Sequence, residues 1–536
     1  MYMGGQPIFI LEKGTRRERG EDAHKNNISA ANAVANAVRT TLGPKGMDKM
    51  LIDSVGDIVI TNDGVTILKE MEIEHPAAKM MIEIAETQEE ECGDGTTSAV
   101  VLAGELLKKA DDLIGRIHAS TISRGYRQAS EKASEILEEM KIKIDIDDEN
   151  ILKNIASTAM TGKSIEINKE QLADIAVDAV RHIAEEKDGK YSADVKNIKI
   201  VKQEGASVDN TELVHGMILD KEKLNERMPK IVKEAKIALL KSALEVKKTK
   251  GKASIEIRDP EQLQRFIDEE EKSIKNMVEK IKKTGANVLF NQKDIDDLAQ
   301  HYLAKEGIFA IDSISKSDME KLSKTTGGNI VNNLNDLSKK DLGSAKDVAE
   351  KVLSGSHFTF IEGSKDMKAV SILLRGSTKH VVDELENAIM DALKVVAVTI
   401  EDGAVLPGGG ATEIELSNRL KDFIGKIEGR EQISFELFAD SLDVIPRVIA
   451  ENAGMDGIDV VMNLNTYHEK EGKKNFGIDV ETGEVKDMFE AGIIEPFRVK
   501  NQAIKSAAEA ANMILRIDDV IASKGAMGGP PEEEEY

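Results

Sequence analysis

Apolar residues near the start of the chain recur at spacings of three and four, which is typical of an amphipathic α-helix. Residues 27–42 carry this pattern, and Gly43-Pro44 directly after it predicts where the helix ends. Two short β-rich runs, at 50–52 and 57–61, are separated by a turn and predict a hairpin. Helical spacing then returns over residues 76–91 and 96–114. The first 150 residues are therefore expected to be mostly helical.

The pattern changes in the middle of the chain. Residues 149–218 mix helical spacing, at 151–158 and 171–186, with a β-rich run at 197–202. Between residues 219 and 371, helical runs alternate with strand-like runs at 287–290, 309–314 and 329–331. Such alternation predicts a parallel sheet with packed helices. A long helix is expected after Lys379, and the chain is mainly helical again after Gly403, with a β-rich patch at 476–486.

Helical segments at both ends thus bracket an α/β region. Because chain termini often lie close together, this order predicts one domain built from both termini, with other domains inserted into it. The length of 536 residues supports three or four domains at roughly 150 residues each. The final residues, 525–536, are rich in Gly, Pro and Glu and predict a disordered tail.

Composition excludes several classes of function. The net charge of -24 repels phosphate backbones, so no nucleic acid partner is expected. A single cysteine, Cys92, excludes an internal disulfide and a multi-cysteine metal site, which fits a reducing compartment. No run of 18 apolar residues occurs, and the first residues lack a signal-peptide pattern. No membrane partner and a cytoplasmic location are therefore expected.

Three glycine-rich turns in the first hundred residues could bind phosphate. The turn at 41–46 reads Thr-Leu-Gly-Pro-Lys-Gly, and glycine lets the backbone approach a bound anion. The turn at 93–98 precedes a helix whose free N–H groups favour phosphate, and Asp94 could be its N-cap or hold Mg²⁺. The turn at 61–66 repeats the Asp-Gly feature at Asp63. Each turn is also compatible with an ordinary helix end or capped helix.

Four later features carry weaker signals. Residues 157–164 nearly match a phosphate-binding P-loop, but they lack its first glycine and follow a helix rather than a strand, so we reject that interpretation. Lys163 remains a candidate to reach a phosphate, against a solvated lysine. Asp391, at the border of an apolar helix stripe, could position a water, against an ordinary helix-flank aspartate. Gly408–410 and Glu495 indicate either a ligand contact or plain loops.

The ordered set of motifs resembles the group II chaperonins, the archaeal thermosome subunits of the TCP-1/chaperonin family. The resemblance covers nearly the whole chain and rests on seven segments. They are 41–49 (TLGPKGMDK), 61–66 (TNDGVT), 93–97 (GDGTT), 205–207 (GAS), 294–303 (DIDDLAQHYL), 495–500 (EPFRVK) and 516–520 (RIDDV).

The resemblance implies a multidomain α+β and α/β fold. It implies a mainly helical equatorial ATP-binding domain at 1–148 and 404–536, and a small α/β intermediate hinge domain at 149–218 and 372–403. It implies an α/β apical substrate-binding domain at 219–371, with a helical lid protrusion at about 245–280.

The resemblance also implies site residues and cofactors. ATP and Mg²⁺ are the expected cofactors, with K⁺ as a further candidate, and Asp94 would hold the Mg²⁺. Asp391 would activate water with Asp63 beside it, and Lys163 would sense the γ-phosphate. Asp391 and Lys163 would lie outside the phosphate site until a hinge movement delivers them. The implied nucleotide-binding residues are Thr41, Leu42, Gly43, Pro44, Lys45, Asp94, Gly95, Thr96, Thr97, Ser98, Gly409, Asp479, Glu495 and Lys500.

A helix after Asp259-Pro260 carries two apolar patches that four acidic residues separate. Leu263, Phe266 and Ile267 form the first patch, which could project while the second packs on a domain. A helix packed along its whole length is the alternative. The resemblance implies that this projection is a built-in lid, so no separate lid co-chaperonin is expected.

The expected function is an ATP-dependent chaperone. The resemblance implies self-assembly into two stacked rings of about eight subunits, which enclose unfolded protein clients and close their lids on ATP hydrolysis. Two alternatives stay open at this point: an ATP-dependent small-molecule kinase and a non-catalytic scaffold.

Overall fold

The computed structural model describes residues 16–52, 54–163, 168–246, 260–364 and 368–522. The chain forms two compact units: residues 1–173 with 387–536, called unit 1 here, and residues 174–386, called unit 2. The boundaries fall within helices α7 (Lys169–Ile183) and α11 (Lys379–Asp402). The division into three domains stays a prediction, and the predicted disordered tail lies outside the described residues.

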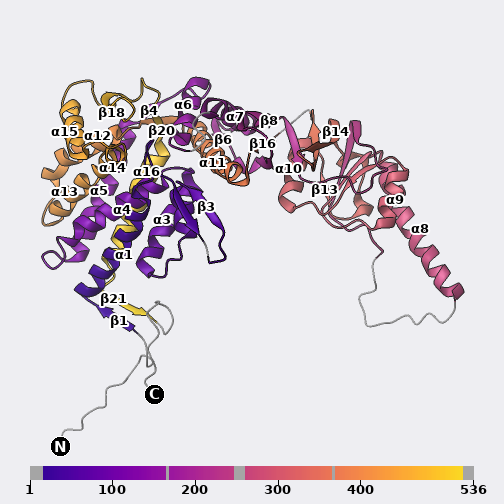
Figure 1. The fold of residues 1–536 in the computed structure, drawn as a ribbon, viewed down its shortest axis with the longest axis horizontal. Coiled ribbons are helices and arrows are strands. Elements are labelled where there is room, and N and C mark those ends of the chain that lie inside the picture. The colour runs from indigo at the N-terminus through magenta and orange to yellow at the C-terminus, as the bar shows by residue number, and fades with distance from the viewer. Residues whose placement is uncertain (1–15, 53, 164–167, 247–259, 365–367, 523–536) are drawn as a thin grey trace, which may run out of the picture. The chain divides into compact units, whose positions relative to one another are not determined.

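Unit 1 is a helical body assembled from both ends of the chain, and Figure 1 shows its long helices side by side around α4. Its core is built from residues such as Leu106, Tyr126 and Phe438, which are fully buried. Helix α5 buries Ile122, Tyr126 and Ala133 along one stripe, as its sequence pattern predicts. The helices are α1 Glu21–Arg39, α2 Gly64–Glu70, α3 Pro76–Cys92, α4 Thr96–Asp111, α5 Ala119–Met140, α6 Glu149–Met160, α12 Ala411–Phe423, α13 Glu431–Ser441, α14 Val444–Asn452, α15 Gly457–His468 and α16 Phe497–Leu515.

Small antiparallel sheets join segments of unit 1 that are far apart in sequence. Strands β1 (Arg16–Arg19) and β21 (Asp519–Ala522) pair, which places the two ends of the described chain side by side. The strand β17 (Ala404–Pro407) pairs with both β20 (Ile494–Pro496) and β4 (Ile142–Lys143). Two hairpins complete the unit: β2 Lys49–Ile52 with β3 Ile58–Thr61, and β18 Phe476–Asp479 with β19 Glu484–Asp487.

Unit 2 contains a seven-stranded mixed sheet with the order β12-β11-β10-β14-β15-β9, in which β13 also pairs with β10. Side chains of β10 alternate between the two faces of the sheet. Ala238 and Leu240 pack with helices α8 and α9, whereas Ile237 and Leu239 pack with α10. The strands are β9 Gly216–Leu219, β10 Ile231–Leu240, β11 Val288–Asn291, β12 Phe309–Ile311, β13 Ile330–Val331, β14 Gly343–Leu353 and β15 Ser356–Glu362, and the helices are α8 Pro260–Thr284, α9 Asp297–Lys305 and α10 Lys316–Thr326.

Two smaller sheets complete unit 2. In the first, β16 (Val370–Gly376) runs parallel to β7 (Ile198–Glu204) and antiparallel to β8 (Glu212–Val214). In the second, β5 (Glu185–Lys187) pairs with β6 (Lys190–Ser192).

The three strands predicted from sequence, now β11, β12 and β13, belong to a parallel part of the sheet that also contains β10, and the predicted helices connect them. The expectation of a wholly parallel sheet is wrong, because β14, β15 and β9, which the sequence pattern did not indicate, are antiparallel. A tight turn joins β14 to β15 through Ser354 and Gly355, and a turn of this length can only connect antiparallel strands. In unit 1, the predicted hairpin at 50–61 and the helices near 27–42, 76–91 and 96–114 are confirmed.

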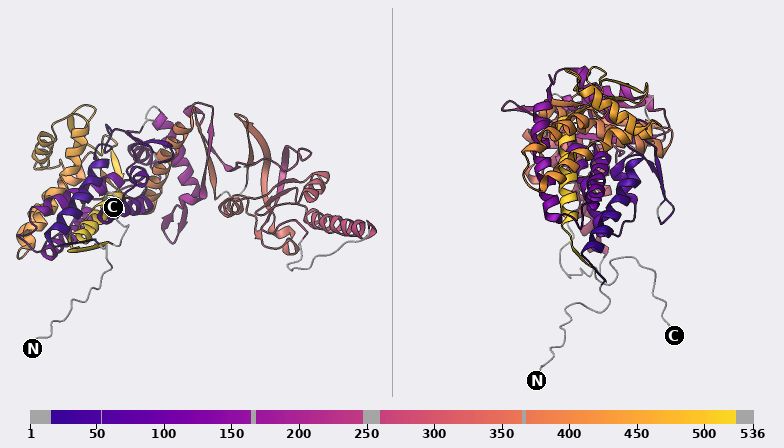
Figure 2. Two further views of the ribbon diagram at one scale, coloured as in Figure 1. Left: turned by 60° about the horizontal axis from the view of Figure 1, so that its bottom comes forward. Right: turned by 90° about the vertical axis from the view of Figure 1, so that its left-hand side faces the viewer.

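Helix α8 carries the two apolar patches. Its second half buries Ile274, Val278 and Ile281 in the core of unit 2. Phe266 and Ile267, in the first half, are 43% and 46% exposed. Figure 2 shows this helix extending past the strands of its sheet. A helix packed along its whole length is therefore excluded for these residues, whereas the side chain of Leu263 and residues 247–259 lie outside the described part.

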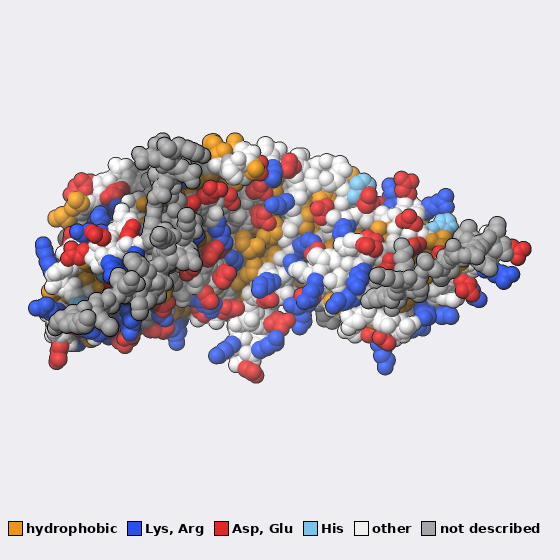
Figure 3. Space-filling model, turned by 90° about the horizontal axis from the view of Figure 1, so that it is seen from below, with side chains coloured by type: hydrophobic (Ala, Val, Ile, Leu, Met, Phe, Trp, Pro, Cys, Tyr) orange, Lys and Arg blue, Asp and Glu red, His pale blue; other side chains and the backbone are white. Residues whose placement is uncertain are grey.

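No helix within the described residues is long and apolar enough to cross a membrane. On the face drawn in Figure 3, acidic and basic side chains are interspersed rather than gathered by sign.

Candidate functional site

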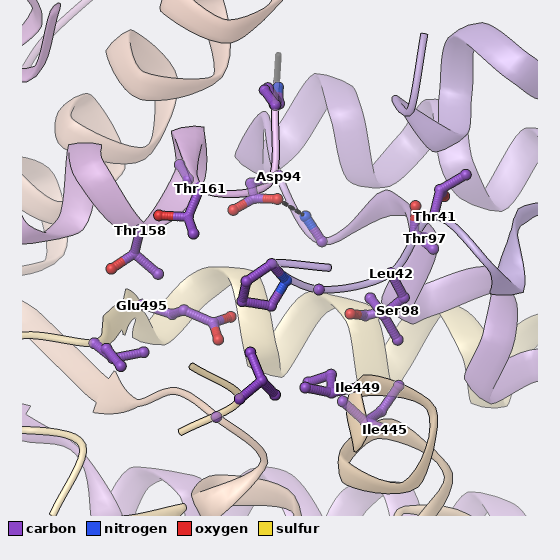
Figure 4. A pocket seen from close by; sticks show the side chains of 18 of the residues that line it. Thr41, Leu42, Asp94, Thr97, Ser98, Thr158, Thr161, Ile445, Ile449 and Glu495 are labelled. Carbon is purple, nitrogen blue, oxygen red and sulfur yellow. Dashed lines mark hydrogen bonds between the residues drawn. The ribbon is translucent and has the colours of Figure 1, made fainter. Parts of the chain in front are cut away.

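A cavity of about 410 Å³ opens in unit 1, within the size range of small-ligand pockets. Polar residues from the glycine-rich turns line one part of it, and Ile445 and Ile449 of α14 line another (Figure 4). The predicted site residues that line the cavity are Thr41, Leu42, Gly43, Pro44, Asp63, Asp94, Gly95, Thr96, Thr97, Ser98, Lys163, Asp391, Gly409, Asp479, Glu495 and Lys500. The exception is Lys45, which is exposed and does not line the cavity.

The start of helix α4 forms one wall of the cavity. The helix begins at Thr96, and its N-cap is Gly95 in the left-handed conformation, with no side-chain cap. The prediction of Asp94 as the N-cap is therefore wrong, because the helix starts one residue later than that role requires. The first N–H groups of α4 are left open toward the cavity, together with the hydroxyls of Thr97 and Ser98, and such a terminus favours an anion.

Asp94 is held by its own turn. Its carboxylate accepts a hydrogen bond from the N–H of Gly95 at 2.6 Å (Figure 4), and its carbonyl oxygen accepts one from Gln88 Nε2 at 2.8 Å. Burial raises the pKa of the Asp94 carboxyl above its usual range, although the Gly95 N–H and the charges of Lys163 and Lys500 oppose the shift. The turn therefore fixes a half-buried carboxylate directly before the open end of α4.

Lys163 and Asp391 form a buried ion pair at the cavity, with their side chains only 9% and 12% exposed. Burial alone would lower the pKa of Lys163, but the charges of Asp391, Asp63 and Asp94 raise it above its ordinary value. Burial raises the pKa of Asp391 well above its ordinary value, and the carboxylates of Asp63, Glu89 and Asp94 add to this effect against the charge of Lys163. The interpretations of a solvated lysine and a helix-flank aspartate are thus wrong.

The places of Lys163 and Asp391 differ from the expectation that a hinge movement is needed to deliver them to the phosphate site. Lys163 and Asp391 already line the cavity that contains Asp94, so no movement is needed in this structure to bring them together. Residues 157–160 are the end of helix α6 rather than a strand, which agrees with the rejection of a P-loop.

Helix α11, which carries Asp391, sits directly on the turn before Asp94. Lys394, one turn further along α11, forms an ion pair with Glu89 and donates a hydrogen bond to the Glu89 carbonyl at 3.0 Å. A Cβ atom at Gly93 would lie 2.2 Å from the Cβ of Lys394. Glycine at position 93 therefore allows the close approach that places Asp391 near Asp94.

Asp63 has two roles in the structure. It is the N-cap of α2, and its carboxylate accepts a hydrogen bond from Thr66 N at 2.9 Å. It also lines the cavity and acts electrostatically on both Asp391 and Lys163. Asp63 therefore caps a helix as in an ordinary turn and also lines the cavity.

At the opposite part of the cavity, Lys500 bridges two carboxylates. Its Nζ lies 2.6 Å from Glu413 Oε1 and 2.9 Å from Glu495 Oε1, and all three side chains are at most 20% exposed. Burial raises the pKa of Glu495, and Glu413 and Asp94 add to the shift while Lys500 opposes it. Asp479 is also buried and is held by Lys486 at 2.7 Å and by the hydroxyl of Thr482 at 2.7 Å.

The Gly408–410 segment is an ordered part of the cavity wall rather than a flexible link. The backbone φ of Gly409 is 59°, in the left-handed region. A Cβ atom at Gly409 would lie 2.7 Å from Met488 Sδ and 3.0 Å from the Ile478 carbonyl oxygen. The sequence pattern of three glycines before a helix thus marks a close backbone contact.

Several lining residues were not predicted from sequence. Thr158, Thr161 and Lys169 come from the segment around Lys163, and Lys169 Nζ lies 3.4 Å from Thr161 Oγ1. Ile445 and Ile449 are four apart on α14, a spacing that indicates one helix face but not what that face contacts. Glu413 does not line the cavity but pairs with Lys500, and it gave no signal, because an acidic residue in the first turn of a helix is common.

The bridge made by Lys500 gives a stability prediction. Lys500→Met should lower the free energy of unfolding of unit 1 by about 3–5 kcal/mol, because Glu413 and Glu495 would remain buried without their partner. Thermal unfolding followed by calorimetry measures the effect. Lys505→Met, on the same helix, is the matched control and should change stability little. An unchanged transition in Lys500→Met would contradict this account of the bridge.

Comparison with known proteins gives one consistent result. Residues 34–525 match the TCP-1/cpn60 chaperonin family. The chain is 58% identical over 521 residues to a thermosome subunit of Methanopyrus kandleri, covering 97% of this chain and 95% of the relative. It is 57% identical over 544 residues to a thermosome subunit beta of Methanothermobacter thermautotrophicus, covering 99% and 100%.

A solved structure also matches, the open-state monomer of a group II chaperonin from Methanococcoides burtonii. The TM-score is 0.60 at 47% sequence identity, and the match covers 79% of this chain and 100% of that one. The family match spans most of the chain, and these relatives share about half or more of its residues. This chain is therefore a member of the TCP-1/cpn60 chaperonin family.

Proposed function

We propose that this chaperonin chain binds and hydrolyses ATP, and that hydrolysis drives the enclosure and folding of unfolded client proteins. The observation that carries the proposal is one cavity in which the open end of α4, the Asp94 carboxylate and the buried Lys163–Asp391 pair meet. This combination provides an anion site, a carboxylate for a cation and a candidate base, which are the parts that phosphoryl transfer to water requires.

The open N–H groups of α4 and the hydroxyls of Thr97 and Ser98 would bind the phosphate groups. Lys163 would neutralise charge that develops on the terminal phosphate. Asp391 would accept a hydrogen bond from the attacking water and take its proton, with Asp63 beside it. Burial raises the pKa of Asp391, which makes its carboxylate a stronger base toward water.

The donor set fits Mg²⁺. Asp63, Asp94 and Asp391 present carboxylate oxygens, the ligands that Mg²⁺ prefers, and burial raises the pKa of both Asp94 and Asp391, with a smaller contribution from the charge of Asp63. Asp94 would hold the ion, which would supply charge neutralisation between phosphate oxygens. A K⁺ ion is a further candidate near the same phosphates.

The remaining wall would bind the nucleoside. Ile445, Ile449 and Ile478 offer apolar surface for the base, while Asp479 and Glu495 offer acceptors for ribose hydroxyls. Gly409 would let the backbone lie against the ligand.

Exposed apolar side chains support self-assembly. The β2–β3 hairpin, which Figure 1 shows beside α3, exposes Met50, Ile52 and Val55 by 62%, 65% and 82%, and Met47 shortly before it is 68% exposed. Apolar side chains exposed together mark a contact with another protein. We expect two stacked rings of about eight subunits in the cytoplasm.

The exposed start of α8 would act as the built-in lid, without a separate co-chaperonin.

The test combines particle size with turnover. Purified full-length protein should elute near one megadalton and hydrolyse ATP only when Mg²⁺ is present, without a small-molecule acceptor. It should also prevent the aggregation of a chemically unfolded client. Turnover that depends on one small molecule would favour a kinase instead, and failure to bind ATP would favour a non-catalytic scaffold.

A further inference from the structure

Three side chains that the chaperonin reaction does not use converge at one end of the sheet in unit 2. Nδ1 of His357 lies 3.0 Å from Glu350 Oε1 and 3.6 Å from Glu222 Oε2. One ligand atom from each residue lies within 4.8 Å of the other two. A nitrogen and two carboxylate oxygens therefore face a common point, and none of the three residues lines the cavity of unit 1.

The sheet fixes this convergence. His357 of β15 lies opposite Val352 of β14, and Glu350 is two residues from Val352, so Glu350 and His357 share one face of the hairpin. Glu222 follows β9, which pairs with the other edge of β15. The hydroxyl of Thr359 donates a hydrogen bond to the Lys221 carbonyl at 2.9 Å, which ties the Glu222 loop to the same strand.

The electrostatic surroundings favour a cation. The Glu350 side chain is only 6% exposed, and its second oxygen lies 3.9 Å from Lys223 Nζ, beyond hydrogen-bond distance. That ammonium is committed elsewhere, because it donates to the carbonyls of Glu226 at 2.8 Å and Met228 at 3.1 Å. A shallow hollow beside the cluster is lined by Asp220, Asp312 and Lys221, so acidic groups outnumber basic ones around it. Within the described residues, His357 is thus the side chain at hydrogen-bond distance from Glu350, and Lys223 is a more distant ion-pair partner.

The donor spacing matches a transition-metal site. Metal–ligand bonds of about 2.0–2.2 Å in tetrahedral geometry place neighbouring ligand atoms about 3.3–3.6 Å apart. Of the two observed distances, 3.6 Å lies in this range and 3.0 Å lies slightly below it. A histidine nitrogen among the donors favours Zn²⁺ over Mg²⁺ and Ca²⁺, which prefer oxygen ligands alone.

We infer that Glu222, Glu350 and His357 form a Zn²⁺ site in unit 2, with water as the fourth ligand. Bound Zn²⁺ connects the loop after β9 to the β14–β15 hairpin, two segments far apart in the sequence. It therefore stabilises this end of the sheet, and it does so independently of nucleotide binding.

Calorimetric titration of the full-length protein with Zn²⁺ tests the site, with saturating Mg²⁺ present to occupy the carboxylates of the nucleotide cavity. We expect one Zn²⁺ per chain. His357→Ala should weaken binding at least about 100-fold, because even residues that only support metal ligands account for about 10–100-fold in affinity. Glu222→Gln, at an exposed side chain, should weaken binding without affecting folding.

His380→Ala is the matched control, since His380 is an exposed histidine of the same unit outside the cluster, and it should bind Zn²⁺ like the unchanged protein. Co²⁺ gives a second measurement, because four-coordinate Co²⁺ with a histidine ligand absorbs strongly in the visible range. Those bands should appear in the unchanged protein and be lost in His357→Ala. No Zn²⁺ binding, or equal binding by His357→Ala and the unchanged protein, would overturn the site.

Discussion

Replacing Asp391 by asparagine should lower the rate of ATP hydrolysis by about 10²–10⁴-fold while nucleotide binding is kept, because that is the usual contribution of a general base. Asparagine retains the size of the side chain and its oxygen acceptor, but it cannot take a proton from water. The binding groups of α4, Asp479 and Glu495 are unchanged in this variant. Single-turnover hydrolysis, with affinity measured separately by a fluorescent nucleotide, separates the two effects.

Two further variants test whether the loss of hydrolysis in Asp391→Asn comes from the missing base. Asp402→Asn lies on the same helix α11, where it pairs with Arg498, and should leave hydrolysis close to the unchanged rate. The double variant Asp391→Asn with Lys163→Met removes both charges of the buried pair, so it should restore lost stability but not hydrolysis. If the double variant recovered turnover, the pair would be structural rather than catalytic.

The helices of unit 1 could be predicted because their burial follows local periodicity. The pattern of residues 27–42 corresponds to α1, whose buried residues Ile28, Ala31 and Val38 are the apolar positions of that pattern. By contrast, β14 contains the run Ala-Lys-Asp-Val-Ala-Glu-Lys, which has no strand preference of its own. It becomes a strand because β10 and β15 pair on its two sides, a tertiary effect that a local pattern cannot contain.

The candidate site also has a part that could be predicted from sequence and a part that could not. Its glycine-rich turns could be found in the sequence because glycine marks backbone that must come close to another group. The pairing of Lys163 with Asp391 could not, since 228 residues separate them and each has an ordinary local environment. The same holds for Glu413, whose partner Lys500 lies 87 residues away. Lys163 and Asp391 were candidates from the sequence and received defined roles from the family resemblance, whereas neither approach indicated Glu413 or Lys394.

Replacing Asp94 by asparagine should remove the dependence on Mg²⁺ and lower hydrolysis by roughly 10²–10³-fold, because metal stabilisation of the transition state contributes several kcal/mol. Asparagine can still accept the hydrogen bond from Gly95 N, so the turn before α4 should keep its conformation. Nucleotide affinity measured in a chelator should be equal or higher, since a buried carboxylate beside phosphates repels them. In the unchanged protein, Mg²⁺ should strengthen binding; in Asp94→Asn it should not.

The effect of Asp94→Asn on thermal stability distinguishes a carboxylate that serves the reaction from one that stabilises the fold. Burial penalises the charged form of Asp94, so its replacement by a neutral side chain should raise the thermal stability of the metal-free protein. If the Asp94 carboxylate instead stabilised the fold, its replacement should lower the thermal stability. Asp112→Asn, in the exposed C-cap position of the same helix α4, is the matched control and should change neither the Mg²⁺ dependence nor the rate. Loss of stability together with retained Mg²⁺-dependent turnover would remove Asp94 from the reaction and assign the metal to other carboxylates of the cluster.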